Sequence, residues 1–99
     1  NLRRADLRGA RLRGARLAGA DLREAQLGPL MITADRLLPA DLTGANLRGA
    51  DMTGADLRRA ILAGADLGRA TLHGAQTRQA DLTEAVLTGV RGLILDQAA

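Results

Sequence analysis

The chain of 99 residues has no phenylalanine, tyrosine or tryptophan, and it also lacks cysteine, serine and lysine. Aromatic side chains normally supply a large part of the buried surface of a globular core, so their absence argues against an ordinary two-layer domain. Without cysteine the chain can form neither a disulfide framework nor a thiolate metal site. The apolar residues are mainly alanine and leucine, which can fill a narrow, repeating core at native density.

Long hydrophobic segments are absent as well. No apolar run approaches the length of a transmembrane helix, and no signal peptide is visible. The chain opens within a repeated pattern, at Asn1-Leu2. We therefore expect a fragment of a longer protein, without a membrane span and located in the cytoplasm.

What the sequence does contain is a repeat of five residues. Leucine or methionine recurs at every fifth position over residues 2–27, 42–72 and 82–87. Alanine lies two residues before the leucine position, at every fifth residue from 5 to 25 and from 40 to 85. Nine of the 12 glycines lie two residues after it, so the unit is Ala–polar–Leu–any–Gly.

A period of five residues fits neither an α-helix nor an extended strand. In a helix, each residue advances by about 100°, so every fifth residue drifts around the axis. In a strand, consecutive leucines would alternate between the two faces. The chain must therefore bend once per unit, with glycine at the bend because it tolerates positive φ and with Asp or Asn bonding nearby backbone amides.

The stretches A-D-L-R-G-A-R-L-R-G-A-R-L-A-G-A-D-L (5–22) and A-D-L-T-G-A-N-L-R-G-A-D-M-T-G-A-D-L (40–57) resemble the pentapeptide-repeat family, whose pattern is A-(D/N)-L-x-x in tandem. The resemblance implies a bacterial protein with an all-β fold, a right-handed quadrilateral parallel β-helix of about four to five coils. We expect a single solenoid over residues 1–99, regular over 1–27 and 40–90, with an interruption at 28–39 and a cap at 91–99.

Residues 28–39 depart from the repeat. This segment has Pro29 near its start and Pro39 at its end. Proline has no N–H to donate to a backbone ladder. In one interpretation, Ile32 and Leu37 continue the inward row, which places Asp35 at an alanine position and buries its carboxylate. A buried carboxylate needs a partner, so this interpretation is the less favoured one.

In the favoured interpretation, Thr33 caps a short helical turn over residues 34–38 that bulges outward. Protruding loops on rigid scaffolds often carry recognition. Candidate contacts with a protein partner in this segment are therefore Thr33, Asp35 and Arg36.

The net charge of +3 is unevenly distributed. Residues 1–25 hold seven arginines and three acidic residues, a local +4, whereas residues 26–99 hold seven arginines and eight acidic residues, or −1. A basic surface can bind an anionic partner, and the candidate contacts here are Arg3, Arg8, Arg13 and Arg23. Phosphates would also fit these arginines, but the lack of aromatic stacking platforms argues against nucleic-acid binding.

The repeat decays after residue 90. An open solenoid end exposes backbone and core, and it must be capped. Leu93, Ile94 and Leu95 are expected to form this cap or, if the end is bare, the seam of a homodimer. The family resemblance implies dimerisation through C-terminal ends, although the aromatic contacts that would anchor such a seam are missing.

Candidates for chemistry are few. The serine, cysteine and lysine nucleophiles of hydrolases and Schiff-base enzymes are absent, and the single histidine, His73, cannot supply a histidine-rich metal site. With coils of about 20 residues, Asp21, Asp41 and Asp81 would share one column interrupted by Ile61. Their expected role is to bond the turn backbone, so we expect no catalytic, cofactor or metal site and no enzyme.

These observations predict a non-catalytic structural or protein-interaction solenoid that presents flat faces to a protein partner. The alternative, which the family resemblance implies, is a DNA mimic that binds type II topoisomerase (gyrase) and protects it from quinolones. A mimic requires a strongly negative surface, whereas this chain is net positive.

Overall fold

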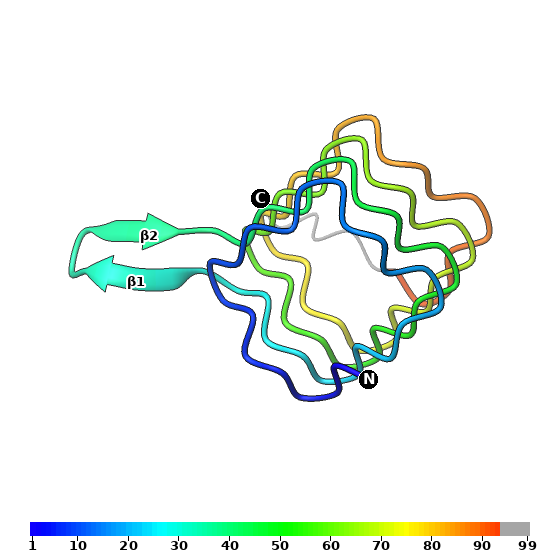
Figure 1. Ribbon diagram of the computed structural model, residues 1–99, viewed down its shortest axis with the longest axis horizontal. Helices are drawn as coiled ribbons and strands as arrows, with labels where there is room; N and C mark the ends of the chain where they lie inside the picture. Colours follow the sequence, from blue (N-terminus) through cyan, green and yellow to red (C-terminus); the bar gives the residue numbers. More distant parts are fainter. Residues whose placement is uncertain (94–99) are drawn as a thin grey trace.

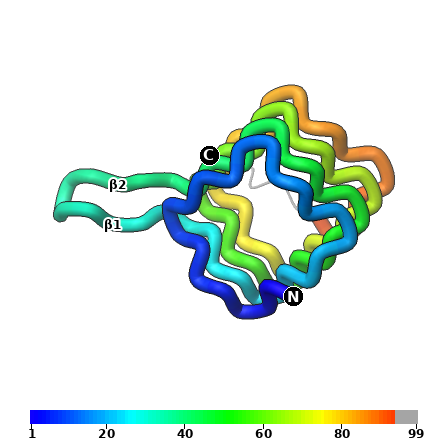
Figure 2. Tube along the Cα trace, in the orientation of Figure 1, coloured from blue at the N-terminus to red at the C-terminus, as the bar shows by residue number. Residues whose placement is uncertain are grey.

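The computed structural model describes residues 1–93. The chain winds into coils of four-sided outline that stack on one another, and one hairpin projects from a corner of the stack (Figures 1 and 2). Parallel backbone bridges join neighbouring coils, for example Asp6 to Gln26 and Asp41 to Ile61, each pair separated by four repeat units. The bridge from Gln26 to Asp56 spans a longer stretch of sequence, because the hairpin lies between them. Four units of the repeat therefore make one coil, one unit on each side.

Each unit ends in a tight turn. The amide of Ala10 donates to the carbonyl of Leu7 at 3.0 Å, and the same bond recurs along the chain. Gly9, which precedes this alanine, has a φ of +69°, as the third position of a type II turn requires. Six other residues hold this conformation without being glycine, with φ between 57° and 61°: Arg4, Glu24, Arg59, Arg69, Gln79 and Glu84. Because the chain bends in every unit, each side of a coil contributes only one bridged residue.

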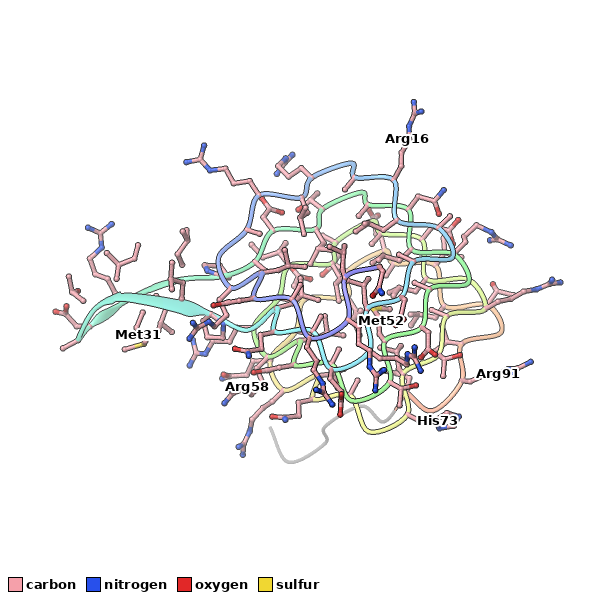
Figure 3. All side chains as sticks on the ribbon, turned by 60° about the horizontal axis from the view of Figure 1, so that its bottom comes forward. Arg16, Met31, Met52, Arg58, His73 and Arg91 are labelled. Atoms are coloured by element: carbon pink, nitrogen blue, oxygen red, sulfur yellow. The ribbon has the colours of Figure 1, made fainter. Side chains whose placement is uncertain are left out.

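The rows of leucine and alanine point into the coil and form its core. From Leu22 to Leu72 these side chains are at most 3% exposed, and Met52 lies among them (Figure 3). The leucines of the first and last coils, such as Leu7 and Leu82, are only half-buried against this core, because they have a neighbouring coil on one side only. The predicted inward row is therefore confirmed.

The interruption is a β-hairpin. Strand β1 (Leu30–Thr33) pairs in antiparallel fashion with β2 (Arg36–Leu38), with a bulge between Met31 and Thr33. The hairpin leaves the coil where Pro29 takes the place of the positive-φ residue of the turn. The proline ring holds φ at a negative value, so this unit cannot close like the others and the chain is directed outward.

Both earlier interpretations of this segment are wrong in part. The helical turn capped by Thr33 does not form, because its residues lie in β2 and in the turn before it. The outward bulge is correct, and the inward placement of Ile32 and Leu37 is not, since they are 52% and 38% exposed. The ladder continues past the insertion, because Leu27 N donates to Asp56 O at 2.7 Å.

Candidate protein-binding site

The aspartates and asparagines of the A-(D/N)-L units are committed to the turns. Each accepts the backbone N–H of the residue two positions later, as from Thr43 to Asp41 at 3.0 Å and from Arg48 to Asn46 at 3.1 Å. Where that residue is arginine, its guanidinium can return to the same carboxylate, and the bonds from Arg58 to Asp56 are 2.9 and 2.8 Å long. The hydrogen bonds from Arg58 lower the pKa of Asp56.

The predicted column of Asp21, Asp41 and Asp81, interrupted by Ile61, is wrong for Asp21 and correct for the other three residues. Asp21 bridges Asp51, while Asp41 and Asp81 lie in a different column, on either side of Ile61. The hairpin adds ten residues, the length of two repeat units, without adding sides to the coil. Bridge partners on either side of it are therefore 30 residues apart in sequence instead of 20. Within residues 1–93, no group of three histidine or acidic side chains is placed to hold a metal ion.

The four basic candidates of the N-terminal region do not form one patch. Arg3 and Arg23 lie on neighbouring coils of one side, since Leu2 N and Arg4 N donate to Asp21 O and Arg23 O. Arg8 and Arg13 lie on the two sides that follow. Three of the four are in ion pairs, at 2.7 Å for Arg8 with Asp6, 2.8 Å for Arg23 with Asp21 and 3.4 Å for Arg13 with Asp41.

The exposed apolar surface is concentrated on the hairpin. Every residue from 30 to 38 is exposed, and the hairpin carries all but one of the exposed large apolar side chains of residues 1–93: Leu30, Met31, Ile32, Leu37 and Leu38, with Val86 as the exception. Figure 3 shows Met31 on this projection, away from the stacked coils. An exposed apolar patch of this kind is typical of an interaction site.

The tip of the hairpin carries the three polar residues predicted as contacts. Thr33 Oγ1 donates to Asp35 Oδ1 at 3.0 Å across the turn, and Arg36 begins β2. All three are exposed. Their role as contacts stays a prediction, and the apolar strands that lead to them were not predicted from the sequence.

The base of the hairpin is packed on Gly9. A Cβ atom at Gly9 would lie 3.0 Å from Leu30 Cβ and 3.3 Å from the carbonyl oxygen of Leu38, whereas a Cβ at Gly14 would meet nothing within 4 Å. Both glycines have positive φ, +69° and +65°. The two positions therefore restrict the backbone in the same way, and only Gly9 is also in close contact with the hairpin.

We expect Gly9→Ala to lower the free energy of unfolding by about 1 kcal/mol more than Gly14→Ala, because it adds overpacking to the strain of positive φ that both share. Urea denaturation checks the difference. NMR shifts of β1 and β2 should change in Gly9→Ala alone. Equal stability and unchanged hairpin shifts in both variants would contradict the contact.

Of the three residues predicted to form an end cap or a dimer seam, the structure describes only Leu93, which is partly buried and packs on the core. Ile94 and Leu95 lie outside the described residues. Within residues 1–93 there is no helix with the length and apolar character that crossing a bilayer requires.

Two further features of the site follow only from the structure. Arg11 and Ile61 lie beside the base of the hairpin with Leu38 and Pro39, and none of the four is among the predicted contacts. One signal was present in the sequence, because Ile61 stands where the repeat has a polar residue. Its proximity to the hairpin depends on the stacking of coils.

Comparison with known proteins agrees with this architecture. The family profile described as pentapeptide repeats matches residues 1–28, 40–76 and 65–91, in 8 copies. Among solved structures, alr5209, a pentapeptide repeat protein from Nostoc PCC 7120, is 39% identical with a TM-score of 0.73, over 88% of this chain and 64% of that protein. No curated protein matches the chain.

A second solved structure is HetL, a pentapeptide repeat protein involved in heterocyst differentiation regulation from the cyanobacterium Nostoc sp. strain PCC 7120. It is 38% identical, with a TM-score of 0.48, and the match covers 91% of this chain and 36% of HetL. The present chain thus spans less than two thirds of either protein. The family profile and the likeness to alr5209 together confirm the right-handed β-helix. Since the profile matches well over half of its residues, the chain belongs to the pentapeptide-repeat family.

Proposed function

We propose that this chain is a non-catalytic interaction module in which the coiled stack holds the β1–β2 hairpin in position to bind a partner protein. The observation that supports this most strongly is the concentration of exposed apolar side chains on the hairpin. A two-stranded hairpin is only marginally stable by itself. The coil that anchors both of its ends reduces the entropy that a partner would otherwise have to remove.

The architecture included in this proposal is one solenoid domain over residues 1–99 with about four to five coils, in a cytoplasmic bacterial protein. The spacing of the bridges, four units apart, supports a coil of four units. The contact surface would include the polar tip, Thr33, Asp35 and Arg36, as well as the apolar strands. Arg3, Arg8, Arg13 and Arg23 are weaker candidates, because three of them already pair with carboxylates.

DNA mimicry toward type II topoisomerase is the less favoured function. The acidic side chains alternate with arginines along the coils, and arginines such as Arg16 and Arg91 extend into solvent (Figure 3). A net charge of +3 opposes the field that a mimic needs. Inhibition of gyrase supercoiling by the purified chain would make DNA mimicry the favoured function instead of the interaction module.

A deletion variant distinguishes the role of the hairpin from that of the coil. Removing residues 29–38 joins Gly28 to Pro39 and restores an uninterrupted run of five-residue units, A-Q-L-G-P-A-D-L. The residue before Ala40 then occupies the position where the other turns have positive φ. Pro39→Gly must accompany the deletion, because proline cannot adopt that φ.

We expect this hairpin-less variant to keep the coil and lose the partner. Its melting temperature should remain within a few degrees of the wild-type value, because no buried core residue is removed. Affinity capture followed by reconstitution from purified components should yield a partner that binds the wild-type chain and not the variant. A folded variant that retains the same partner with unchanged affinity would refute the proposed function.

A further inference from the structure

A groove of about 460 Å³ lies where the hairpin meets the coil. It is lined by Leu38 and Pro39, where the hairpin rejoins the coil, and by coil residues that include Arg11, Arg13, Asp41 and Ile61. Figures 1 and 2 show that β2 leads from the tip of the hairpin back to the coil. The volume is within the usual range for a ligand pocket, about 300–1,000 Å³.

One half of the groove is apolar for a reason that is visible in the repeat. Ile61 lies between Asp41 and Asp81 in its column, at a position where the repeat normally has Asp or Asn bonding the turn. It is only partly buried, so its side chain leaves apolar surface beside the exposed Leu38. Ile61 cannot make the hydrogen bond that Asp or Asn makes to the turn at this position. It exposes an apolar side chain to solvent instead.

The other half of the groove is positively charged. Arg11 has no ion pair within the described residues, and Arg13 reaches Asp41 only at 3.4 Å. Asp41 is already engaged by the backbone N–H and hydroxyl of Thr43. The groove therefore contains two arginines and one carboxylate. Neither guanidinium group is strongly engaged, so both could donate hydrogen bonds to the carboxylate of a ligand.

The shape of the site favours an extended ligand. In the described part of the chain, the hairpin sheet consists of β1 and β2 alone, so the outer edge of β2 is free to pair with another strand. Strand addition to a free edge is a common mode of peptide recognition. In an extended peptide, residues i and i+2 lie on the same face, so one residue can enter the apolar half while the other meets the arginines.

We propose that this groove binds an extended segment of a partner protein in which an apolar residue is followed two positions later by Asp or Glu. The inference depends on the proposed function and names the chemistry of the partner. The apolar side chain contacts Leu38, Pro39 and Ile61, and the carboxylate accepts hydrogen bonds from Arg11 and Arg13.

The probe is a fluorescein-labelled peptide, Gly-Ile-Thr-Glu-Thr-Ile-Thr-Glu-Gly, whose binding is followed by anisotropy at low salt. Two control peptides replace each Glu by Lys or each Ile by Ser. Arg11→Gln is compared with Arg16→Gln, since both arginines follow the alanine of a unit and neither has an ion pair in residues 1–93, but only Arg11 lines the groove. Ile61→Asn restores the usual repeat residue and removes the apolar side chain that the coil contributes to the groove.

We expect saturable binding of the Ile/Glu peptide and of neither control peptide. Arg11→Gln should raise the Kd at least fivefold and Ile61→Asn at least tenfold, estimates on the order of one lost charged hydrogen bond and one lost side-chain contact. Arg16→Gln should change the Kd less than about twofold. The melting temperature of each variant confirms that it is folded.

Equal weakening by Arg11→Gln and Arg16→Gln would show nonspecific attraction and overturn the proposal, as would unchanged binding to Ile61→Asn. A wild-type dimer in sedimentation that Ile61→Asn dissociates would show that a second copy fills the groove, which also overturns it. If no peptide binds while the hairpin-less variant still loses its partner, this inference fails and the proposed function stands. If that variant keeps its partner, the proposed function itself fails.

Discussion

Leu57→Lys is expected to unfold the central coils at room temperature. Leu57 is 1% exposed, and it lies between neighbouring coils, since Leu27 N donates to Asp56 O and Leu57 N donates to Gln76 O, both at 2.7 Å. A lysine there would place an ammonium group on the axis without a partner, at a cost of several kcal/mol. Typical domains are stable by only about 5–15 kcal/mol.

Two variants isolate the cause of this loss. Leu7→Lys changes the same column in the half-buried first coil, where the ammonium can reach solvent through the open end, so its effect should be much smaller. Leu57→Ala leaves a cavity without a charge and should cost about 2–5 kcal/mol. Circular dichroism and thermal melting provide the measurement. Equal stability of Leu57→Lys and the surface variant Arg58→Ala would invalidate the inward and outward assignment.

Acidification from about pH 5 to about pH 2 should lower the melting temperature. The pKa is lowered for six aspartates: Asp6, Asp21, Asp41, Asp51, Asp56 and Asp81. In each, the largest cause is a hydrogen bond from the side chain two residues later, and for Asp6 the pKa falls from 3.8 to about 2 because of Arg8.

The direction of the effect follows from proton binding. Because the folded pKa lies below the unfolded one, the unfolded chain binds more protons at acidic pH, so the contribution of these aspartates to stability is complete above about pH 5 and decreases toward pH 2. High salt should weaken the contributions of Asp6, Asp21 and Asp56, whose partners are arginines. It should affect the threonine-bonded aspartates less.

A double variant, Asp6→Asn with Asp21→Asn, tests the assignment. Asparagine keeps the oxygen that accepts the turn N–H, as Asn46 does from Arg48 at 3.1 Å, but it does not titrate in this range. The dependence of melting temperature on pH should therefore be flatter in the variant than in the wild type. Identical slopes below pH 4 would mean that these carboxylates do not contribute.

The repeat was sufficient to predict most of the fold, because each unit is a local structure. Alanine, leucine and glycine at fixed offsets predict which side chain is buried and where the chain bends, and the structure confirms both at Leu57 and Gly9. The turn-bonding role of the aspartates was equally local, since donor and acceptor are two residues apart, as in Thr43 and Asp41. No knowledge of distant contacts was needed for these features.

The interruption was harder to interpret from its sequence. The apolar run Leu-Met-Ile-Thr was compatible with more than one local structure, and Thr33 resembled a helix cap. Pro29 was the decisive residue, because it stands at the position where most other units have a residue with positive φ, a conformation that proline cannot adopt. The exposed strands and the contact of Gly9 with Leu30 follow from it.

The sequence by itself determined the period, the inward row and the bonding within each turn, all of which depend on residues close together along the chain. Only the tertiary structure decided which distant units become neighbours. The hairpin moves later units by half a coil, so Asp21 meets Asp51 rather than Asp41. The same shift places Arg11 and Ile61 beside Leu38, because stacking depends on the total length of each coil and not on any single unit.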